Sequence, residues 1–342
     1  MDHKKTCNTI RRLTAVSVDI VKIQWITAIL VIQAGCATSG DSASESAMPT
    51  LNADALQVCE PLQNTDFAFT SNADGDDDIY LFDASNTSII RLTDSEAEDH
   101  WASWSPDGRM LAFQSARDGN HEIYIQVLPG GEPVNSSQNP EQDLAPSWSP
   151  NGGYIVYYSS RDVTWAEAGP IGGHLFVLRV QGSLLGRIQT EAFHSPTLIG
   201  WSSDSSTLFY ARYAKGKEGI YSLDLATGDE VALLALKGRF PGLASTNPAP
   251  GTVDYNVSVE NGVMIYQLSL ADGTSRRLSP DRGQHYYANW SPDRSALLMT
   301  SAQDAIGQAF DIRCVAADGS YDVAVINDAS DARAAVWRPG RH

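Results

Sequence analysis

The sequence is poor in positive charge, and this shortage excludes the partners that basic surfaces attract. It has 24 Lys and Arg against 41 Asp and Glu, a formal net charge of −17. Residues 1–35 hold five of the basic and two of the acidic side chains, so the remainder carries 19 against 39, a net charge of −20. Such a surface repels nucleic acid and anionic lipid headgroups. We therefore expect contact with a membrane only through a lipid, not through a basic patch.

The motifs of common enzyme classes are also missing. The sequence has no Gly-x-Ser-x-Gly elbow, no Walker loop and no Gly-x-Gly-x-x-Gly. It has no His-x-x-x-His and no paired Cys spacing that would indicate zinc. We therefore predict no enzymatic activity, no cofactor and no metal ligands. A Ser/His/Asp triad assembled by the fold stays open, because its members need not be neighbours in the sequence.

Long apolar runs are absent, and the longest lies near the N-terminus. Residues 23–32 follow five basic residues and are too short to span a membrane as a helix, which indicates a signal peptide over residues 1–35. The next residues, ending in Ala34-Gly35-Cys36, resemble a bacterial lipobox, in which Cys36 becomes the lipidated first residue. A plain secretory signal and a short uncleaved anchor are the alternatives. Ala37 resembles the outer-membrane address of enterobacterial lipoproteins.

The stretch that follows is small and polar, and few cysteines are left beyond it. Residues 36–60 predict a flexible tether, because they cannot bury enough apolar surface to become ordered. Of the four cysteines, Cys7 would leave with the signal and Cys36 would carry the lipid. Cys59 and Cys314 remain, in a chain expected to be exported to an oxidising compartment. We expect either a disulfide between them or two unpaired thiols.

One short motif recurs along the rest of the chain. Trp104-Ser105-Pro106-Asp107-Gly108 returns in related forms, and its tryptophans are Trp104, Trp148, Trp201, Trp290 and Trp337. Ser-Pro-Asp-Gly is typical of a tight turn, because Pro fixes φ at the second position and Gly tolerates the exit. Six repeat units are marked by a second feature, the residue that ends each apolar run: Phe69, Phe113, Tyr157, Tyr210, Tyr255 and Met299. An aromatic follows eleven residues later in every unit except the third, where the step is nineteen; Met299 leads to Phe310.

Each unit predicts four short antiparallel strands. In the second unit these strands are expected at residues 102–104, 110–115, 122–126 and 133–136, with Gly-bearing turns between them. No helical period competes after residue 67. Six units of about 44 residues predict an all-β, six-bladed β-propeller over residues 61–342. The first unit lacks its first strand and residues 334–337 supply one, so we expect the C-terminal strand to join the N-terminal blade and close a monomeric ring.

These residues resemble a known family. Trp-Ser-Pro-Asp-Gly, an apolar strand ending Phe-x-Ser, Arg-Asp-Gly-Asn and Glu-Ile-Tyr, all within residues 104–126, resemble the TolB-type propeller repeat, a WD40-like repeat also called PD40. The resemblance covers about residues 67–340. TolB carries an α/β domain before its propeller, which the 24 residues at 37–60 cannot hold. The resemblance implies a periplasmic ring that docks envelope proteins at its axial opening.

Irregular loops are expected to gather on one face of such a ring, around its axial mouth. Variable loops on a rigid scaffold are where binding usually occurs. The third unit has an insertion at residues 161–173, and the connections between the other units carry polar and aromatic residues. The candidate partner-binding residues are Asp99, His100, Asp143, Trp165, His194, Arg239, His285, Tyr286 and Arg333.

Several of these residues have a second interpretation. The histidines are either ligands in the funnel, including metal ligands, or solvated loop residues. Trp165 is either an interface anchor or a residue folded back on its own blade. Residues 74–78, Asp-Gly-Asp-Asp-Asp, resemble a calcium loop but have Ser85 at the twelfth position, so they are not an EF-hand. We interpret them as a solvated acidic hairpin, with calcium in this loop or on the axis as the alternative.

Two functions follow. The first is a non-enzymatic lipoprotein on the periplasmic side of the outer membrane, whose propeller docks another envelope protein. The second is a carbohydrate-binding or oligosaccharide-cleaving propeller that uses His, Asp and Arg at the same mouth. The first is preferred, because aromatic platforms for sugars are few and no acid pair with the spacing of a glycosidase is visible.

Overall fold

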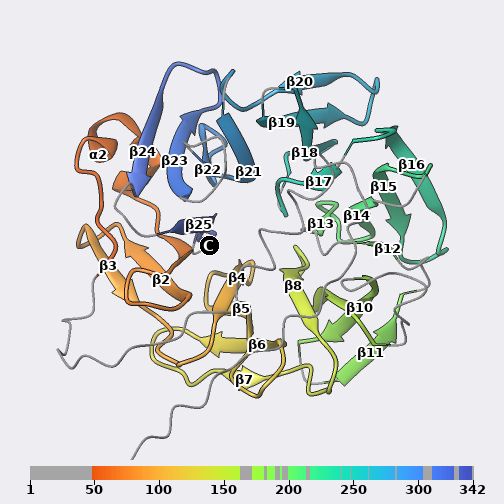
Figure 1. Cartoon of the computed structure of the whole chain (residues 1–342), viewed down its shortest axis with the longest axis horizontal. Coiled ribbons are helices and arrows are strands. Elements are labelled where there is room, and N and C mark those ends of the chain that lie inside the picture. The colour runs from red at the N-terminus through yellow and green to blue at the C-terminus, as the bar shows by residue number, and fades with distance from the viewer. Residues whose placement is uncertain are drawn as a thin grey trace, which may run out of the picture. The chain divides into compact units, whose positions relative to one another are not determined.

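Five hydrogen-bonded sheets account for almost all of the regular structure. The computed structural model describes residues 48–161, 172–180, 183–188, 193–194, 199–212, 216–239, 241–246, 248–260, 262–281, 283–302, 310–326 and 331–340. The chain divides into two units, Met1–Glu45 and Ser46–His342, and all these residues belong to the second. Its sheets follow one another around a common centre (Figure 1).

The strands pair almost entirely in sequence order. The first sheet is β25 (Ala332–Trp337), β1 (Phe67–Ser71), β2 (Asp78–Asp83) and β3 (Ser88–Arg91). The second is β4 (Asp99–Trp104), β5 (Met110–Ser115), β6 (Glu122–Val127) and β7 (Val134–Asn135). The third is β8 (Asp143–Trp148), β9 (Tyr154–Ser159), β10 (Gly172–Arg179) and β11 (Ser183–Arg187), with β12 (Phe193–His194) also on β10. The fourth is β13 (Gly200–Trp201), β14 (Thr207–Arg212), β15 (Gly219–Asp224) and β16 (Glu230–Ala235).

The fifth sheet has eight strands and contains two successive antiparallel groups. The first group is β17 (Pro241–Leu243), β18 (Thr252–Val259), β19 (Gly262–Ser269) and β20 (Ser275–Arg277). The second is β21 (Gly283–Trp290), β22 (Ala296–Ala302), β23 (Phe310–Ala316) and β24 (Asp322–Ile326). A short parallel pairing between β19 and β21 joins them. The all-β prediction is therefore confirmed.

The recurring aromatics are partners across each central hairpin. Phe69 lies opposite Tyr80, Phe113 opposite Tyr124, and three further pairs follow the same rule. Their ring centroids are 5.6–6.1 Å apart and stacked. Such cross-strand pairs stabilise a sheet by about 0.5–1.5 kcal/mol beyond their buried area.

The last unit breaks this rule, although Met299 and Phe310 keep the eleven-residue step. Met299 lies opposite Arg313, and Phe310 lies opposite Ala302 at the end of the hairpin. Equal spacing in the sequence therefore does not give equal register, because register also depends on the length of the connecting turn. Phe310 is half-buried, away from the core position that its counterparts occupy.

The recurring tryptophans tie neighbouring sheets together. The indole N–H of Trp104 donates to the carbonyl of Val336, and that of Trp201 donates to the carbonyl of Ser147, each at 3.2 Å. One apolar cluster combines β1, β2, β4, β5 and β6, with Trp104 and Phe113 among its members. The core therefore lies between the faces of adjacent sheets.

The Ser-Pro-Asp-Gly turn is built as expected. The Gly108 N–H donates to the carbonyl of Ser105, and the Ser105 hydroxyl donates to Asp107. Gly108 has φ +65°, and a Cβ there would come within 2.9 Å of the Pro339 carbonyl oxygen. Glycine is therefore required twice, by the backbone angle and by the segment packed against the turn.

The two ends of the described segment meet in the first sheet. Strand β25 pairs antiparallel with β1, with Trp337 opposite Phe67. Arg338 extends this contact, because its guanidinium donates to the Gly108 carbonyl and to Asp66. Cys59 and Cys314 form a disulfide across a sequence separation of 255 residues.

The expected tether requires a correction at its end. Leu51 forms a bridge with Ile326 of β24, and the Asn52 N–H donates to the Val325 carbonyl. A short helix, α2 (Ala55–Val58), and a 3-10 turn, η2 (Glu60–Gln63), follow. Ala55, Cys59 and Leu62 are fully buried, so this stretch does bury enough apolar surface to become ordered. No helix in the described part of the chain is long and apolar enough to cross a bilayer.

Candidate functional site

The innermost strands carry a repeated irregularity where they converge. Trp101 in β4, Ala145 in β8 and Ala334 in β25 have φ of +62°, +52° and +53°, and the register of each strand shifts at that point. Each of these residues lies three positions before a recurring tryptophan. A non-glycine residue in this region costs about 1–3 kcal/mol and is found most often at functional sites. The shared irregularity therefore lies at the same position relative to the recurring tryptophan in all three strands.

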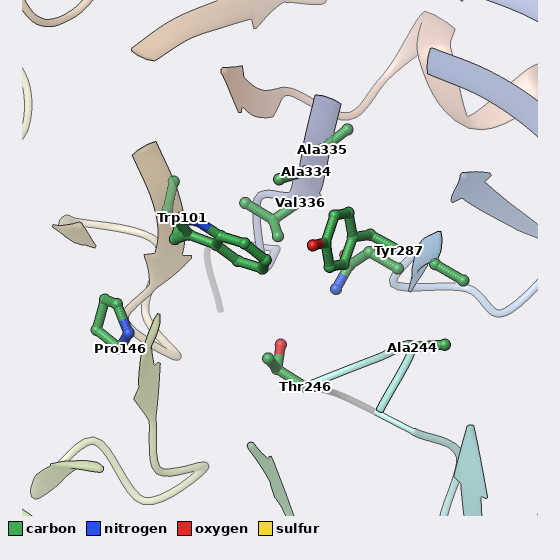
Figure 2. A pocket seen from close by; sticks show the side chains of 11 residues that line it. Trp101, Pro146, Ala244, Thr246, Tyr287, Ala334, Ala335 and Val336 are labelled. Atoms are coloured by element: carbon green, nitrogen blue, oxygen red, sulfur yellow. The ribbon is translucent and has the colours of Figure 1, made fainter. Parts of the chain in front are cut away.

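Two large aromatics meet at this level. The rings of Trp101 and Tyr287 are 4.7 Å apart between centroids and meet edge to face. Figure 2 shows them facing each other across a pocket whose other lining residues are mostly small. That lining comes from β4, β8, β21, β25 and the segment after β17: Ala102, Pro146, Ala244, Thr246, Ala288, Asn289, Ala334, Ala335 and Val336.

The aromatic surface continues beyond this pair. Tyr286 lies 6.4 Å from Tyr287 between ring centroids and 5.5 Å from Phe310, which it meets edge to face. We call Trp101, Tyr287, Tyr286 and Phe310 the aromatic row. All four are half-buried. Sequence reasoning listed Tyr286 and missed Phe310, because it used Phe310 only to mark the step of the last repeat unit.

Asp99 was predicted to bind a partner protein, but its side chain forms an ion pair within its own sheet. Its side chain is fully buried and accepts from the Arg117 guanidinium at 2.8 Å. Arg117 in turn lies over the Tyr124 ring, 4.7 Å from its centroid. The Arg117 guanidinium is therefore held between the Asp99 carboxylate and the Tyr124 ring.

Asp143 has the same arrangement in the next sheet. Its fully buried carboxylate accepts from Arg161 at 2.6 Å, and Arg161 lies 4.7 Å from the Phe176 ring centroid. Burial raises the pKa of Asp143, and Ser159 and Arg161 partly offset that rise. Arg117 and Arg161 each stand four residues after the first aromatic of their unit, a recurrence that would have revealed these pairs in the sequence.

His285 and Arg333 also have partners. His285 is buried, with its Nδ1 2.8 Å from the Ser301 hydroxyl. Arg333 donates to Asp331 and to Asp77, and so links β25 to the turn before β2. Arg239 is exposed on the turn after β16. His194 pairs with Gly172 through its backbone, and Trp165 lies outside the described residues.

His100 belongs to a small polar cluster with two residues that sequence reasoning did not select. Its Nδ1 is 3.2 Å from an Asp77 carboxylate oxygen, and its ring lies 5.5 Å from the His121 ring between centroids. Ligand atoms of Glu98, His100 and His121 all lie within 4.8 Å of one another. Burial, with His100 beside it, lowers the pKa of His121 to about 4, so this imidazole is neutral at pH 7.

The acidic hairpin is a second cluster of ligand-type residues. Carboxylate oxygens of Asp74, Asp76 and Asp78 lie within 4.8 Å of one another. Arg91 pairs with both Asp74 and Asp78, so a guanidinium already supplies positive charge there. Burial and the neighbouring Asp74 raise the pKa of Asp76. Calcium at this loop stays a prediction.

Comparison with known proteins bears out the fold. Residues 62–168 match the PD40 family model, described as the TolB beta propeller domain. No curated protein matches the chain. TolB from Acinetobacter baumannii superposes with a TM-score of 0.68 at 16% identity, over 81% of this chain and 67% of that one.

Two other solved structures show how widely the architecture is used. Hydrazine synthase from Kuenenia stuttgartiensis has a TM-score of 0.62 at 14% identity, over 80% of this chain and 46% of that one. Oligogalacturonate lyase from Vibrio parahaemolyticus has a TM-score of 0.51 at 13% identity, over 77% and 74%. Identities this low show the fold alone. The chain therefore has an all-β, TolB-like β-propeller fold.

Proposed function

We propose that this protein is a non-enzymatic binding module of the bacterial cell envelope. Its six four-stranded blades form a ring completed by β25 beside β1, and a partner protein docks where the innermost strands converge. Export and lipidation at Cys36 place it on the periplasmic side of the outer membrane. The proposal combines the TolB-like fold with the signal and lipobox patterns of the sequence.

The aromatic row is the observation that carries the docking site. Tyr and Trp are enriched in the energetic centres of protein interfaces, because they bury a large area at a low cost in side-chain entropy. Here Trp101, Tyr286 and Tyr287 stand side by side with Phe310; all four are half-buried, and Trp101 is one of the positive-φ residues. Ion pairs of Arg333 with Asp77 and Asp331 border them and supply a polar rim.

The charged residues near this row favour binding over catalysis. General acid–base work needs a carboxyl group that can reach a substrate proton. Asp99 and Asp143 are fully buried and paired with Arg117 and Arg161, so both are engaged in holding their sheets. The acids first suggested for a catalytic role therefore have structural partners.

The test is capture of interacting proteins from an envelope extract by the full chain and by Tyr286→Ala. The variant removes one ring from the middle of the row, and a hot-spot loss of about 2 kcal/mol predicts roughly 30-fold weaker binding. Val134→Ala is the control, since Val134 is 61% exposed on the short strand β7. A protein retained by wild type and Val134→Ala but lost by Tyr286→Ala supports docking at the row. Equal recovery by wild type and both variants would show that the docking site lies elsewhere.

A carbohydrate-active propeller is the second candidate. The likeness to an oligogalacturonate lyase supports it, as does the Glu98, His100 and His121 cluster beside the aromatic row. Incubation with oligogalacturonate, followed by the ultraviolet absorbance of an unsaturated product, tests it directly. Product formation that His121→Gln abolishes would replace the docking proposal.

A further inference from the structure

The cluster of Glu98, His100 and His121 lies at a junction between strands of the second sheet. Glu98 immediately precedes β4, His100 lies in β4, and His121 immediately precedes β6. A carboxylate oxygen and two imidazole nitrogens come within 4.8 Å of one another. His100 lies 2 residues after Glu98, and His121 lies 21 residues after His100, a spacing that no linear metal motif describes.

Hydrogen bonds of the backbone fix Glu98, His121 and the residue that precedes His100. The Glu98 carbonyl accepts from the Ala116 N–H at 3.2 Å, and the His121 carbonyl accepts from the Asp143 N–H at 2.8 Å. The His121 N–H donates to the Gln142 side chain at 3.0 Å. The residue between Glu98 and His100 donates from its backbone to the Asp77 carbonyl at 2.7 Å. The side chains therefore project from a framework that is already fixed, as a preorganised site requires.

His100 is oriented by a carboxylate. Its Nδ1 lies 3.2 Å from Asp77, and Asp77 also accepts from Arg333. A carboxylate acceptor that is also paired with a guanidinium selects the imidazole tautomer with hydrogen on Nδ1 and leaves the Nε2 lone pair available. A carboxylate behind a histidine is the usual support of a metal-binding imidazole.

His121 has a polar atom whose hydrogen-bonding capacity is not met within the described residues. Its Nδ1 is shielded from solvent and has no hydrogen-bond partner there. A buried polar atom without a partner is costly, and most in native proteins are satisfied by protein, water or an ion. An ion bound between the two imidazoles would offset the desolvation of the His121 ring.

We propose that Glu98, His100 and His121 bind one divalent transition-metal ion, with Zn²⁺ as the ion of highest affinity among those tested below. Imidazole favours zinc and its neighbours, whereas calcium prefers sites made wholly of oxygen ligands. Three protein ligands leave a fourth tetrahedral position for water or for a group on a bound molecule. The site goes beyond the docking proposal, and neither depends on the other.

Calorimetric titration of the full chain, stripped of metal with a chelator, tests the site. Zn²⁺, Co²⁺ and Ca²⁺ are added separately to wild type, Glu98→Gln, His100→Gln and His121→Gln. Two controls carry changes outside the cluster: His285→Gln, in a buried histidine that contacts Ser301, and Asp76→Asn, in the acidic hairpin. We expect one Zn²⁺ per chain, at least tenfold weaker binding in each cluster variant, and no change in either control.

Cobalt provides a readout that a folding defect does not imitate. Co²⁺ held by two imidazole nitrogens should give visible absorption bands, and these should change in every folded cluster variant, as judged by circular dichroism. Glu98→Gln is the mildest change and decides the matter if a histidine variant fails to fold. Absence of Zn²⁺ binding by wild type would overturn the proposal. So would equal Zn²⁺ affinity in Glu98→Gln and wild type, or Zn²⁺ binding that only Asp76→Asn removes.

Discussion

In the sheet β4–β7 all four strands come from residues 99–135, whereas the sheet with β1–β3 takes its innermost strand, β25, from residues 332–337. In the continuous sheet, the innermost strand is tied to the next hairpin by Asp99 and Arg117. In the joined sheet the corresponding positions are Ala332 and Ala73, which cannot form an ion pair. Here β25 is tied to the turn before β2 by the ion pair of Arg333 with Asp77, and the Cys59–Cys314 disulfide and the contacts of Arg338 with Gly108 and Asp66 add to it.

This difference shows that one architecture can be held by two kinds of contact. A local hairpin closes a short loop, so one buried ion pair beside stacked rings is enough to fix it. A sheet assembled from distant segments must overcome a much larger loss of chain entropy. In the joined sheet the ion pairs therefore act together with a covalent link and with the buried side chains of β25.

The largest effect should come from removing the strand that joins the ends. A chain lacking residues 332–342 loses the buried side chains Ala332, Ala335 and Trp337 and leaves β1 without a partner on one side. We expect no cooperative thermal unfolding transition by circular dichroism. A chain lacking only residues 341–342 should melt like wild type. Normal melting of the longer truncation would show that β25 is dispensable.

Loss of the disulfide should be the next largest effect. The Cys59→Ala/Cys314→Ala variant removes a link across 255 residues, and we expect the free energy of unfolding to fall by about 4 kcal/mol. Urea titrations of wild type with and without reductant, alongside the variant, measure this. Reductant should lower the stability of wild type and leave the variant unchanged. An unaltered wild-type midpoint in reductant would contradict the role given to this bond.

Breaking the pair of the continuous sheet should cost somewhat less. Arg117→Met keeps the apolar contact with the Tyr124 ring but leaves the buried Asp99 carboxylate with the Ser95 hydroxyl alone. We expect a loss of about 3 kcal/mol in urea unfolding, since an uncompensated buried charge is costly. Arg109→Met, at an exposed arginine of the preceding turn, is the control. Equal stability of Arg117→Met and Arg109→Met would show that the Asp99–Arg117 ion pair does not stabilise this sheet.

The smallest effect should appear in a third type of contact, a buried acid held by neutral donors. Asp254 accepts from the Trp290 indole at 2.7 Å and from Gln267 at 3.0 Å, and burial raises its pKa to about 6 from 3.8. The folded state therefore keeps this proton after the unfolded state has lost it. The resulting stabilisation is complete below about pH 4 and is lost as the pH rises through about 6.

The Asp254→Asn variant isolates this contribution. The stability of the wild type relative to the variant should fall by about 2 kcal/mol between pH 4 and pH 7, in urea titrations at both values. Other groups titrate equally in both chains and cancel in the difference. A difference that stays constant with pH would mean that Asp254 ionises in the folded state as it does in the unfolded chain.

The sequence predicted the regular part of this molecule because that part depends on local patterns. Strand β5 was expected at its observed bounds, since alternation, turn residues and aromatic spacing all agree there. The site was less accessible. The positive φ of Trp101 and the approach of His121 to His100 arise from packing between strands that no short window contains. Asp99 was selected for its position, but the recurrence of Arg117 and Arg161 four residues after the first aromatic of their units, which indicates its ion-pair partner, was not used.

The pairing of β25 with β1 also means that β1 must wait for its partner strand while the chain is being synthesised. Strand β1 leaves the ribosome roughly 270 residues before the strand that covers its free edge, which at the usual translation rates is a delay of tens of seconds. During that interval β1, whose residues are all buried in the folded protein, has an edge with unpaired backbone groups. The nascent chain therefore carries an open sheet edge until its last strand is made.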